Sequence, residues 1–242
     1  MSETPVALVT GAGTGIGRAI ASGLADEGFR VGVHYRSSEA GARELADKLP
    51  EAFLVKGDIA RTEDVDAMVK ALKADEGRLD VLVNNAGTNV NGLTPAMSID
   101  AYDTVAAIER GTWYLTKLVL RRFMLRQKAG RIINITSVVG HTGNPGQVPY
   151  TMVKAGLHAM TLSLAQEMAG RAILVNSVAP GFIGTEMTDE LPDEIRQAML
   201  ARIPLGRMGS PEEVADVVSW LATRASYVNG TVVHVNGGMY GG

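Results

Sequence analysis

A glycine-rich turn between a buried strand and an amphipathic helix constrains the fold of this 242-residue chain more than any other feature. The strand is expected at residues 5–10 and the helix at 15–27. Glycines let the backbone of such a turn approach a diphosphate, which the amides and dipole of the helix N-terminus attract. A glycine-rich loop without function is the plain alternative. The turn reads Thr10-Gly11-Ala12-Gly13-Thr14-Gly15-Ile16-Gly17, a Thr-Gly-x-x-x-Gly-x-Gly spacing that fits no register of Gly-x-Gly-x-x-Gly.

Strands and helices are expected to alternate along the whole chain, with no repeat and no linker. The strands are predicted at 5–10, 31–35, 52–56, 80–83, 131–136, 172–178 and 231–235. The helices are predicted at 15–27, 38–49, 62–76, 100–127, 149–169 and 211–223, with a looser helical piece at 188–202. This alternation predicts a single α/β domain over 1–242, a Rossmann-type doubly wound fold whose seven-stranded, mostly parallel sheet carries helices on both faces.

The distinctive polar and glycine-rich motifs all fall where predicted strands end. In such a sheet the ligand crevice lies outside the carboxyl ends of the strands. The sequence therefore predicts one site built from scattered motifs, whose first members are Thr10, Arg36, Asp58, Asn84, Ser137 and Pro180.

Composition narrows the class of protein further. The net charge is −3 without a basic block, which argues against nucleic acid as a partner. Cysteine is absent and the four His have no ligand spacing, so we expect neither disulfides nor a metal site. No signal peptide or membrane-length apolar run is expected, and the protein is predicted to be cytoplasmic.

Tyr150 and Lys154 lie four residues apart, on one face of a predicted helix, and Ser137 precedes them at the end of a strand. An unperturbed Tyr has a pKa of about 10 and is a poor acid at neutral pH. A neighbouring ammonium is expected to lower that pKa, and a serine hydroxyl offers the second hydrogen bond that a developing alkoxide needs. The arrangement of these three side chains predicts a catalytic site that protonates a carbonyl oxygen.

Further motifs join this set. Asn84-Asn85-Ala86-Gly87 follows the fourth predicted strand, Asn176-Ser177-Val178-Ala179-Pro180-Gly181 falls at the sixth, and Asn236-Gly237-Gly238 follows the last. With the turn and the Ser-Tyr-Lys set, the chain resembles the short-chain dehydrogenase/reductase family from end to end. It looks most similar to the bacterial β-ketoacyl-[acyl-carrier-protein] reductases, a likeness carried by residues 130–135, 137–140, 179–183 and 234–240.

The resemblance implies an NADP(H) cofactor and catalysis by Ser137, Tyr150 and Lys154. No acid occurs from Val31 to Ser38, and Arg36 is well placed for a 2′-phosphate, although Arg36 as an ordinary solvated residue is the alternative. Many NADP-dependent relatives carry a basic residue where this chain has Thr14. The residues implied to bind cofactor are Thr10, Gly11, Gly13, Thr14, Gly15, Ile16, Gly17, Arg36, Ser37, Asp58, Ile59, Asn85, Ala86, Gly87, Tyr150, Lys154, Pro180, Gly181 and Ile183.

The implied reaction is NADPH-dependent reduction of a β-ketoacyl thioester carried on acyl carrier protein. That acidic carrier would dock on basic residues, for which Lys128 and Arg171 are candidates beside a plain surface role. A variable lid at about 184–208, with Met187 and Met199, would cover the substrate. A homotetramer is expected around the helices at 100–127 and 149–169. Two alternatives stay open: a reductase or dehydrogenase of a polyketide, sugar or free ketone, and a catalytically weak structural subunit.

One position departs from the family pattern. Members place an Asn in the helix before Ser137, where it helps a water chain carry protons to the lysine. Aligning Trp113 and Lys117 puts Ile108 at that position, and a one-residue slip puts Glu109 there. One expectation is that Tyr150 is reprotonated more slowly, or by another route through Glu109 or Thr112, and Ile108→Asn should raise turnover if the missing relay limits it. The other is that a backbone carbonyl holds the water and the side chain hardly matters.

Overall fold

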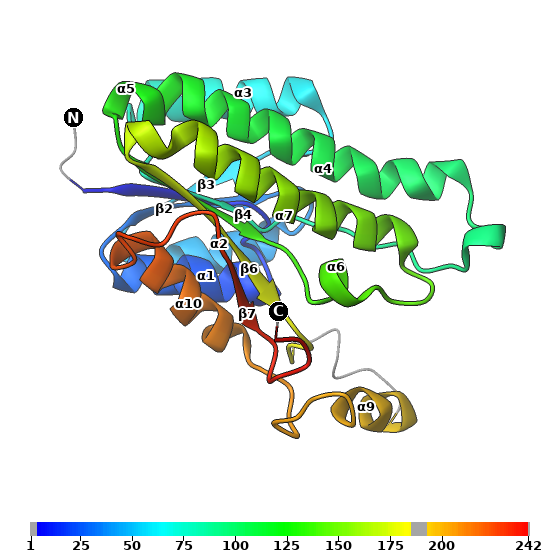
Figure 1. Ribbon diagram of the computed structural model, residues 1–242. Coiled ribbons are helices and arrows are strands. Elements are labelled where there is room, and N and C mark those ends of the chain that lie inside the picture. Colours follow the sequence, from blue (N-terminus) through cyan, green and yellow to red (C-terminus); the bar gives the residue numbers. More distant parts are fainter. Residues whose placement is uncertain (1–3, 185–192, 242) are drawn as a thin grey trace.

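A seven-stranded sheet forms the centre of the computed structural model, which describes residues 4–184 and 193–241 (Figure 1). The strands run parallel in the order β3-β2-β1-β4-β5-β6-β7. The order reverses between β1 and β4, which places a ligand crevice at their carboxyl ends. The strands are β1 (Val6–Val9), β2 (Arg30–Tyr35), β3 (Ala52–Lys56), β4 (Val81–Asn84), β5 (Gly130–Ile135), β6 (Ile173–Pro180) and β7 (Val232–Val235).

Helices cover both faces of the sheet, as the alternation predicts (Figure 1). One core packs α1, α2 and α10 on the sheet through residues such as Ile20, Leu45 and Leu221; the other packs α3 and α4 through Val65 and Leu115. Alongside α4 lies α7. The main helices are α1 (Gly15–Asp26), α2 (Glu39–Lys48), α3 (Thr62–Asp75), α4 (Ile99–Val119), α7 (Val148–Met168), α9 (Asp193–Leu200) and α10 (Pro211–Thr223).

The predicted helix at 100–127 differs in its last turns. It continues from α4 through a π-helical stretch, Leu120–Met124, to a short α5, Leu125–Gln127. Hydrophobic spacing cannot distinguish these i→i+5 bonds from α-helical ones. The looser helical piece is present as α9, and the part of it at 188–192 lies outside the described residues.

Short elements were not expected from the sequence. These are η1 (Thr94–Ala96), α6 (Val139–Thr142) and η3 (Ala169–Arg171), each too short to show a period. Across the described chain, none of the helices combines the length and apolar character needed to cross a membrane.

A chain of buried polar side chains ties the middle of the sheet to α4 and α7. The Asn84 amide donates to Thr116 Oγ1 at 3.0 Å and to Asn134 Oδ1 at 2.8 Å. The Asn134 amide donates to Thr161 Oγ1 at 2.8 Å, and that hydroxyl lies 2.7 Å from Ser177 Oγ. Buried polar groups are costly unless paired, so this chain favours a single placement of the two helices on β4, β5 and β6.

Candidate active site

Ser137, Tyr150 and Lys154 come together at the carboxyl edge of the sheet. Ser137 follows β5, and the residues on either side of it form backbone hydrogen bonds to β6. Thr136 N–H donates to Val178 O and Val138 N–H donates to Pro180 O, each at 2.8 Å. Tyr150 lies in the first turn of α7, which begins beside a proline, and Lys154 lies one turn later. The geometry therefore unites the three side chains that the sequence singles out.

The two ionisable members of this set are buried, and burial moves both pKa values. The Lys154 ammonium donates to the Ile135 carbonyl at 2.7 Å and lies 5.5 Å from the centre of the Tyr150 ring. Burial lowers the pKa of Lys154 to about 8, so the ammonium form prevails at neutral pH. Burial raises the pKa of Tyr150, and a hydrogen bond with Ser137 only partly opposes this.

The expectation of a lowered pKa for Tyr150 is therefore wrong for the protein alone. Burial of the phenolate sets the direction of the shift, and the Lys154 ammonium is engaged with the Ile135 carbonyl. Tyr150 stays protonated at neutral pH, which is the form that can donate a proton.

The glycine-rich turn forms a cradle that side chains would fill. Gly11 and Gly15 have φ values of +66° and +52°, which residues with a side chain rarely adopt. A Cβ at Gly13 would lie 2.5 Å from Ser38 Oγ, and one at Gly17 would overlap the Gly11 carbonyl. At the start of α1, Thr14 makes no side-chain cap to the helix amides, which suits a diphosphate. The turn thus fits a dinucleotide.

Three side chains hold the turn in place. Gly11 N–H donates to His34 Nδ1 at 3.0 Å, and His34 Nε2 lies 3.1 Å from the Gly57 carbonyl. The Asn85 amide donates to the carbonyls of Thr10 and Gly11 at 2.8 and 3.2 Å. Thr10 Oγ1 donates to the Val83 carbonyl and accepts from Asn85 N–H.

Of these, His34 is, in the sequence, only one of four histidines without ligand spacing. Its structural role is specific: it joins the turn to the end of β3, and burial lowers its pKa to about 4, which keeps it neutral. A histidine ending a buried strand is the one sequence signal for that role. The resemblance implies that Thr10 and Asn85 bind cofactor. In the structure, these side-chain groups form the hydrogen bonds that hold the turn in place.

The other implied cofactor residues line the same edge of the sheet. Exposed Arg36 follows β2, with its guanidinium 3.9 Å from the Asp58 carboxylate. A Cβ on Gly87 would lie 3.7 Å from Lys154 Nζ, which places the Asn84–Gly87 segment against this lysine. The Ile183 side chain packs into the core, so any cofactor contact there falls to its backbone. Ser37, Ile59, Ala86 and Gly181 also follow strand ends, and Pro180 is the last residue of β6.

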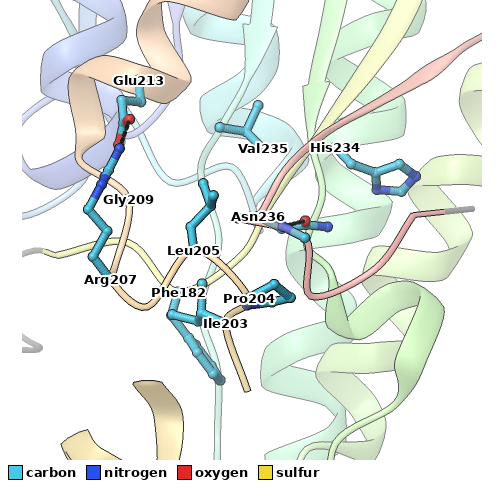
Figure 2. A pocket seen from close by; sticks show the side chains of 12 residues that line it. Phe182, Ile203, Pro204, Leu205, Arg207, Gly209, Glu213, His234, Val235 and Asn236 are labelled. Carbon is cyan, nitrogen blue, oxygen red and sulfur yellow. Dashed lines mark hydrogen bonds and ion pairs between the residues drawn. The ribbon is translucent and has the colours of Figure 1, made fainter. Parts of the chain in front are cut away.

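A hollow of about 430 Å³ is lined by other residues than this set (Figure 2). Phe182, Ile203, Pro204 and Leu205 give it an apolar lining, and none of Ser137, Tyr150 and Lys154 contributes. The Arg207–Glu213 ion pair stands beside Gly209, with oxygen and nitrogen 2.6 Å apart. Ile203, Pro204 and Leu205 belong to the predicted lid at 184–208. The part of that lid at 185–192, with Met187, is outside the described residues, as is the Met199 side chain.

The three remaining histidines gather with Tyr240 in one aromatic cluster. His141 stacks on His158 and on Tyr240, with ring centres 4.0 and 4.7 Å apart, and His234 meets His141 edge-on at 4.8 Å. Burial lowers the pKa of all three imidazoles, that of His158 to about 4. The cluster joins α6, α7 and β7. No set of three acidic, His or Cys side chains could hold a metal ion in the residues described.

Lys128 and Arg171 lie at the edge of the sheet where strands begin, whereas Tyr150 lies at the carboxyl edge. Lys128 ends α5 and Arg171 ends η3, just before β5 and β6 begin. The 21 residues of α7 separate Arg171 from the end that holds Tyr150, a distance of roughly 30 Å at 1.5 Å per residue. A carrier docked on these two residues would therefore stand far from the catalytic set of the same chain.

Comparison with known proteins identifies the family. Residues 11–240 match the family described as enoyl-(acyl carrier protein) reductase. The chain is 45% identical to a 3-oxoacyl-[acyl-carrier-protein] reductase of Staphylococcus aureus, over 99% of this chain and all of the relative. The chain belongs to the short-chain dehydrogenase/reductase family. Reductases with the same name from Vibrio cholerae and Aquifex aeolicus are 44% and 46% identical, each over at least 97% of both chains. Members of this family use a nicotinamide cofactor.

Proposed function

We propose that the protein is an oxidoreductase that reduces a β-ketoacyl thioester, carried on acyl carrier protein, to the β-hydroxyacyl thioester with NADPH. The observation that carries the proposal is the convergence of Ser137, Tyr150 and Lys154 beside a turn that fits a dinucleotide. Relatives of 44–46% identity over nearly the whole chain, all named 3-oxoacyl-[acyl-carrier-protein] reductases, support the substrate.

The chain's own residues supply binding, orientation and a proton. A bound nicotinamide cofactor supplies the hydride that the carbonyl carbon accepts. The hydroxyls of Ser137 and Tyr150 orient the carbonyl oxygen, and Tyr150 gives that oxygen its proton as negative charge develops there. Lys154, an ammonium at neutral pH, binds the nicotinamide ribose and stabilises the tyrosinate left behind.

The two names found by comparison differ in the bond that is reduced. An enoyl reductase reduces a carbon–carbon double bond, whereas a 3-oxoacyl reductase reduces a ketone. A pair of hydroxyls at one oxygen suits the ketone, because its reduction leaves an alkoxide that must be protonated.

A substrate panel tests the proposed function. NADPH oxidation is measured with β-ketoacyl, enoyl and free-ketone substrates, the acyl groups being attached to carrier protein or to coenzyme A. We expect turnover of the β-ketoacyl thioesters. Turnover of enoyl thioesters alone, of free ketones alone, or of nothing would contradict the proposal, and the last result would favour a structural subunit.

Assembly into a homotetramer through α4 and α7 is part of the proposal. The apolar side chains between Ile108 and Leu125 cover more than one helical face, of which one is expected to meet the sheet and the rest to need a partner. Six of them are buried within the chain itself, namely Leu115, Leu118, Val119, Leu120, Phe123 and Met124. Trp113 on α4 stays half exposed, and so do Met152 and Leu162 on α7. These three form the part of the surface for which a second copy would provide cover.

Light scattering at micromolar concentration should give the mass of a tetramer for the parent protein. Trp113→Asp and Leu162→Asp should lower the mass, because each places a charge in the proposed contact. A monomeric parent would contradict the assembly. A carrier docked on Lys128 and Arg171 could reach only the active site of a neighbouring copy. A monomeric protein would have no such copy, so this result would also contradict the proposed docking.

A further inference from the structure

A small cavity lies between α4 and α7, next to the catalytic lysine. The centre of a water molecule can occupy about 10 Å³ of this cavity, which is enough space for one water. Tyr150 and Lys154 line it from α7, and four residues of α4 face them across it. The lining from α4 includes Ile108, Glu109 and Thr112.

Glu109 is the one carboxylate in that lining. The residue is half-buried, so it borders both the cavity and the surface. Its Oε1 packs over the Cα of Gly156 on α7, where any Cβ would overlap it. Glycine is a poor helix former, and at this position its missing side chain leaves room for the carboxylate. Glu109 is thus held against the catalytic helix.

We propose that Glu109 passes protons from solvent, through a water in this cavity, to Lys154, and so restores the proton that Tyr150 gives up in each turnover. The inference rests on the proposed ketone reduction. One proton leaves Tyr150 for the product oxygen, the lysine ammonium returns one to the tyrosinate, and the water returns one to the lysine. Glu109 protonates that water and takes its next proton from bulk solvent.

The electrostatics of the cavity favour this direction. Burial raises the pKa of Glu109, while it lowers the pKa of Lys154 to about 8. The two shifts bring donor and acceptor closer in proton affinity. Tyr150 and Lys154 are the titratable groups that face Glu109 from α7; on α4 itself, Arg110 is turned away and donates to the Ala60 carbonyl at 3.2 Å.

Glu109→Gln tests the relay, since it removes the ionisable proton but keeps the shape of the side chain. A direct acid contributes about 10²–10⁴-fold, so for an indirect donor we expect a fall in kcat of about 10-fold. NADPH affinity and Tm should stay at the parent values, and the solvent deuterium isotope effect should increase. Glu167→Gln, at an exposed glutamate of α7, is the matched control and should change nothing.

Two kinds of rescue separate a proton relay from a structural role. Imidazole or formate buffer should raise the kcat of Glu109→Gln in proportion to its concentration, and Glu109→Asp should keep most of the activity. Ile108→Asn should restore turnover in the Glu109→Gln background, where an amide can hold the water. Parent-like kcat and isotope effect in Glu109→Gln would overturn the proposal, as would a loss that neither buffer nor Asp repairs.

A parent protein without any NADPH-dependent turnover would refute the proposed function. The interaction between Glu109 and Lys154 can then be tested by a measurement that does not depend on catalysis. Carbon-13 NMR of the Glu109 carboxyl gives its pKa in the parent and in Lys154→Met. If the two groups share the cavity, loss of the ammonium raises the pKa of Glu109. An unchanged pKa would overturn the inference.

Discussion

Tyr150→Phe should lower the rate of NADPH-dependent ketone reduction by at least about 100-fold, the lower end of the usual effect of deleting a positioned acid. The substitution removes the hydroxyl that protonates the oxygen but keeps a ring in the same place. NADPH affinity should stay near the parent value, because the variant retains Lys154 and the glycine-rich turn. Steady-state kinetics together with a fluorescence titration of NADPH measure both quantities.

Tyr227→Phe is the matched control for that experiment. Its side chain is fully exposed, and its hydroxyl has no part in the proposed chemistry. The control should keep full turnover. Parent-like turnover in Tyr150→Phe itself would exclude Tyr150 as the proton donor, whereas a joint loss of turnover, cofactor affinity and Tm would point to misfolding.

Arg36→Ala should weaken the binding of NADPH about 10- to 100-fold, equivalent to about 1.5–3 kcal/mol for a charge-assisted hydrogen bond to phosphate. NADH lacks the 2′-phosphate, so its affinity should change little. The Asp58 carboxylate 3.9 Å away strengthens the expected contrast, because without Arg36 it would repel a phosphate. The measurement is the dissociation constant of each cofactor in the parent and in the variant.

Arg43→Ala controls for the loss of a positive charge in the same region. Arg43 lies on α2, exposed and paired with Glu39 at 2.9 Å. Its replacement should shift both dissociation constants slightly and equally. Equal weakening of NADPH and NADH by Arg36→Ala would show that Arg36 does not read the 2′-phosphate.

The sequence by itself determined the order of the elements and the edge of the sheet at which the motifs meet. Strand and helix periods are local properties, so the seven strands, α1 and α7 could be placed from their own residues. In a parallel sheet the carboxyl ends of the strands share one edge, which brings Ser137 near Tyr150 without knowledge of side-chain contacts. The spacing of Tyr150 and Lys154 on one helix is equally local.

Only the tertiary structure decided the quantities that depend on burial. Whether the pKa of Tyr150 falls or rises depends on the balance between desolvation and a nearby charge. Burial has the larger effect, and the pKa is raised. The Lys154 ammonium is turned toward the Ile135 carbonyl, a group that no spacing rule selects. The neutral His34 that holds Gly11 depends on strand packing in the same way.

Contacts between distant segments were also beyond the sequence. The apolar side chains between Ile108 and Leu125 cover more than one helical face, and only the folded chain shows which of them, such as Leu115 and Phe123, are buried and which, such as Trp113, stay half exposed. The approach of Glu109 to Gly156, 47 positions further along the chain, depends on how α4 crosses α7. Periodicity reports which face of a helix is apolar, whereas the partner of that face is set by the packing of the whole domain.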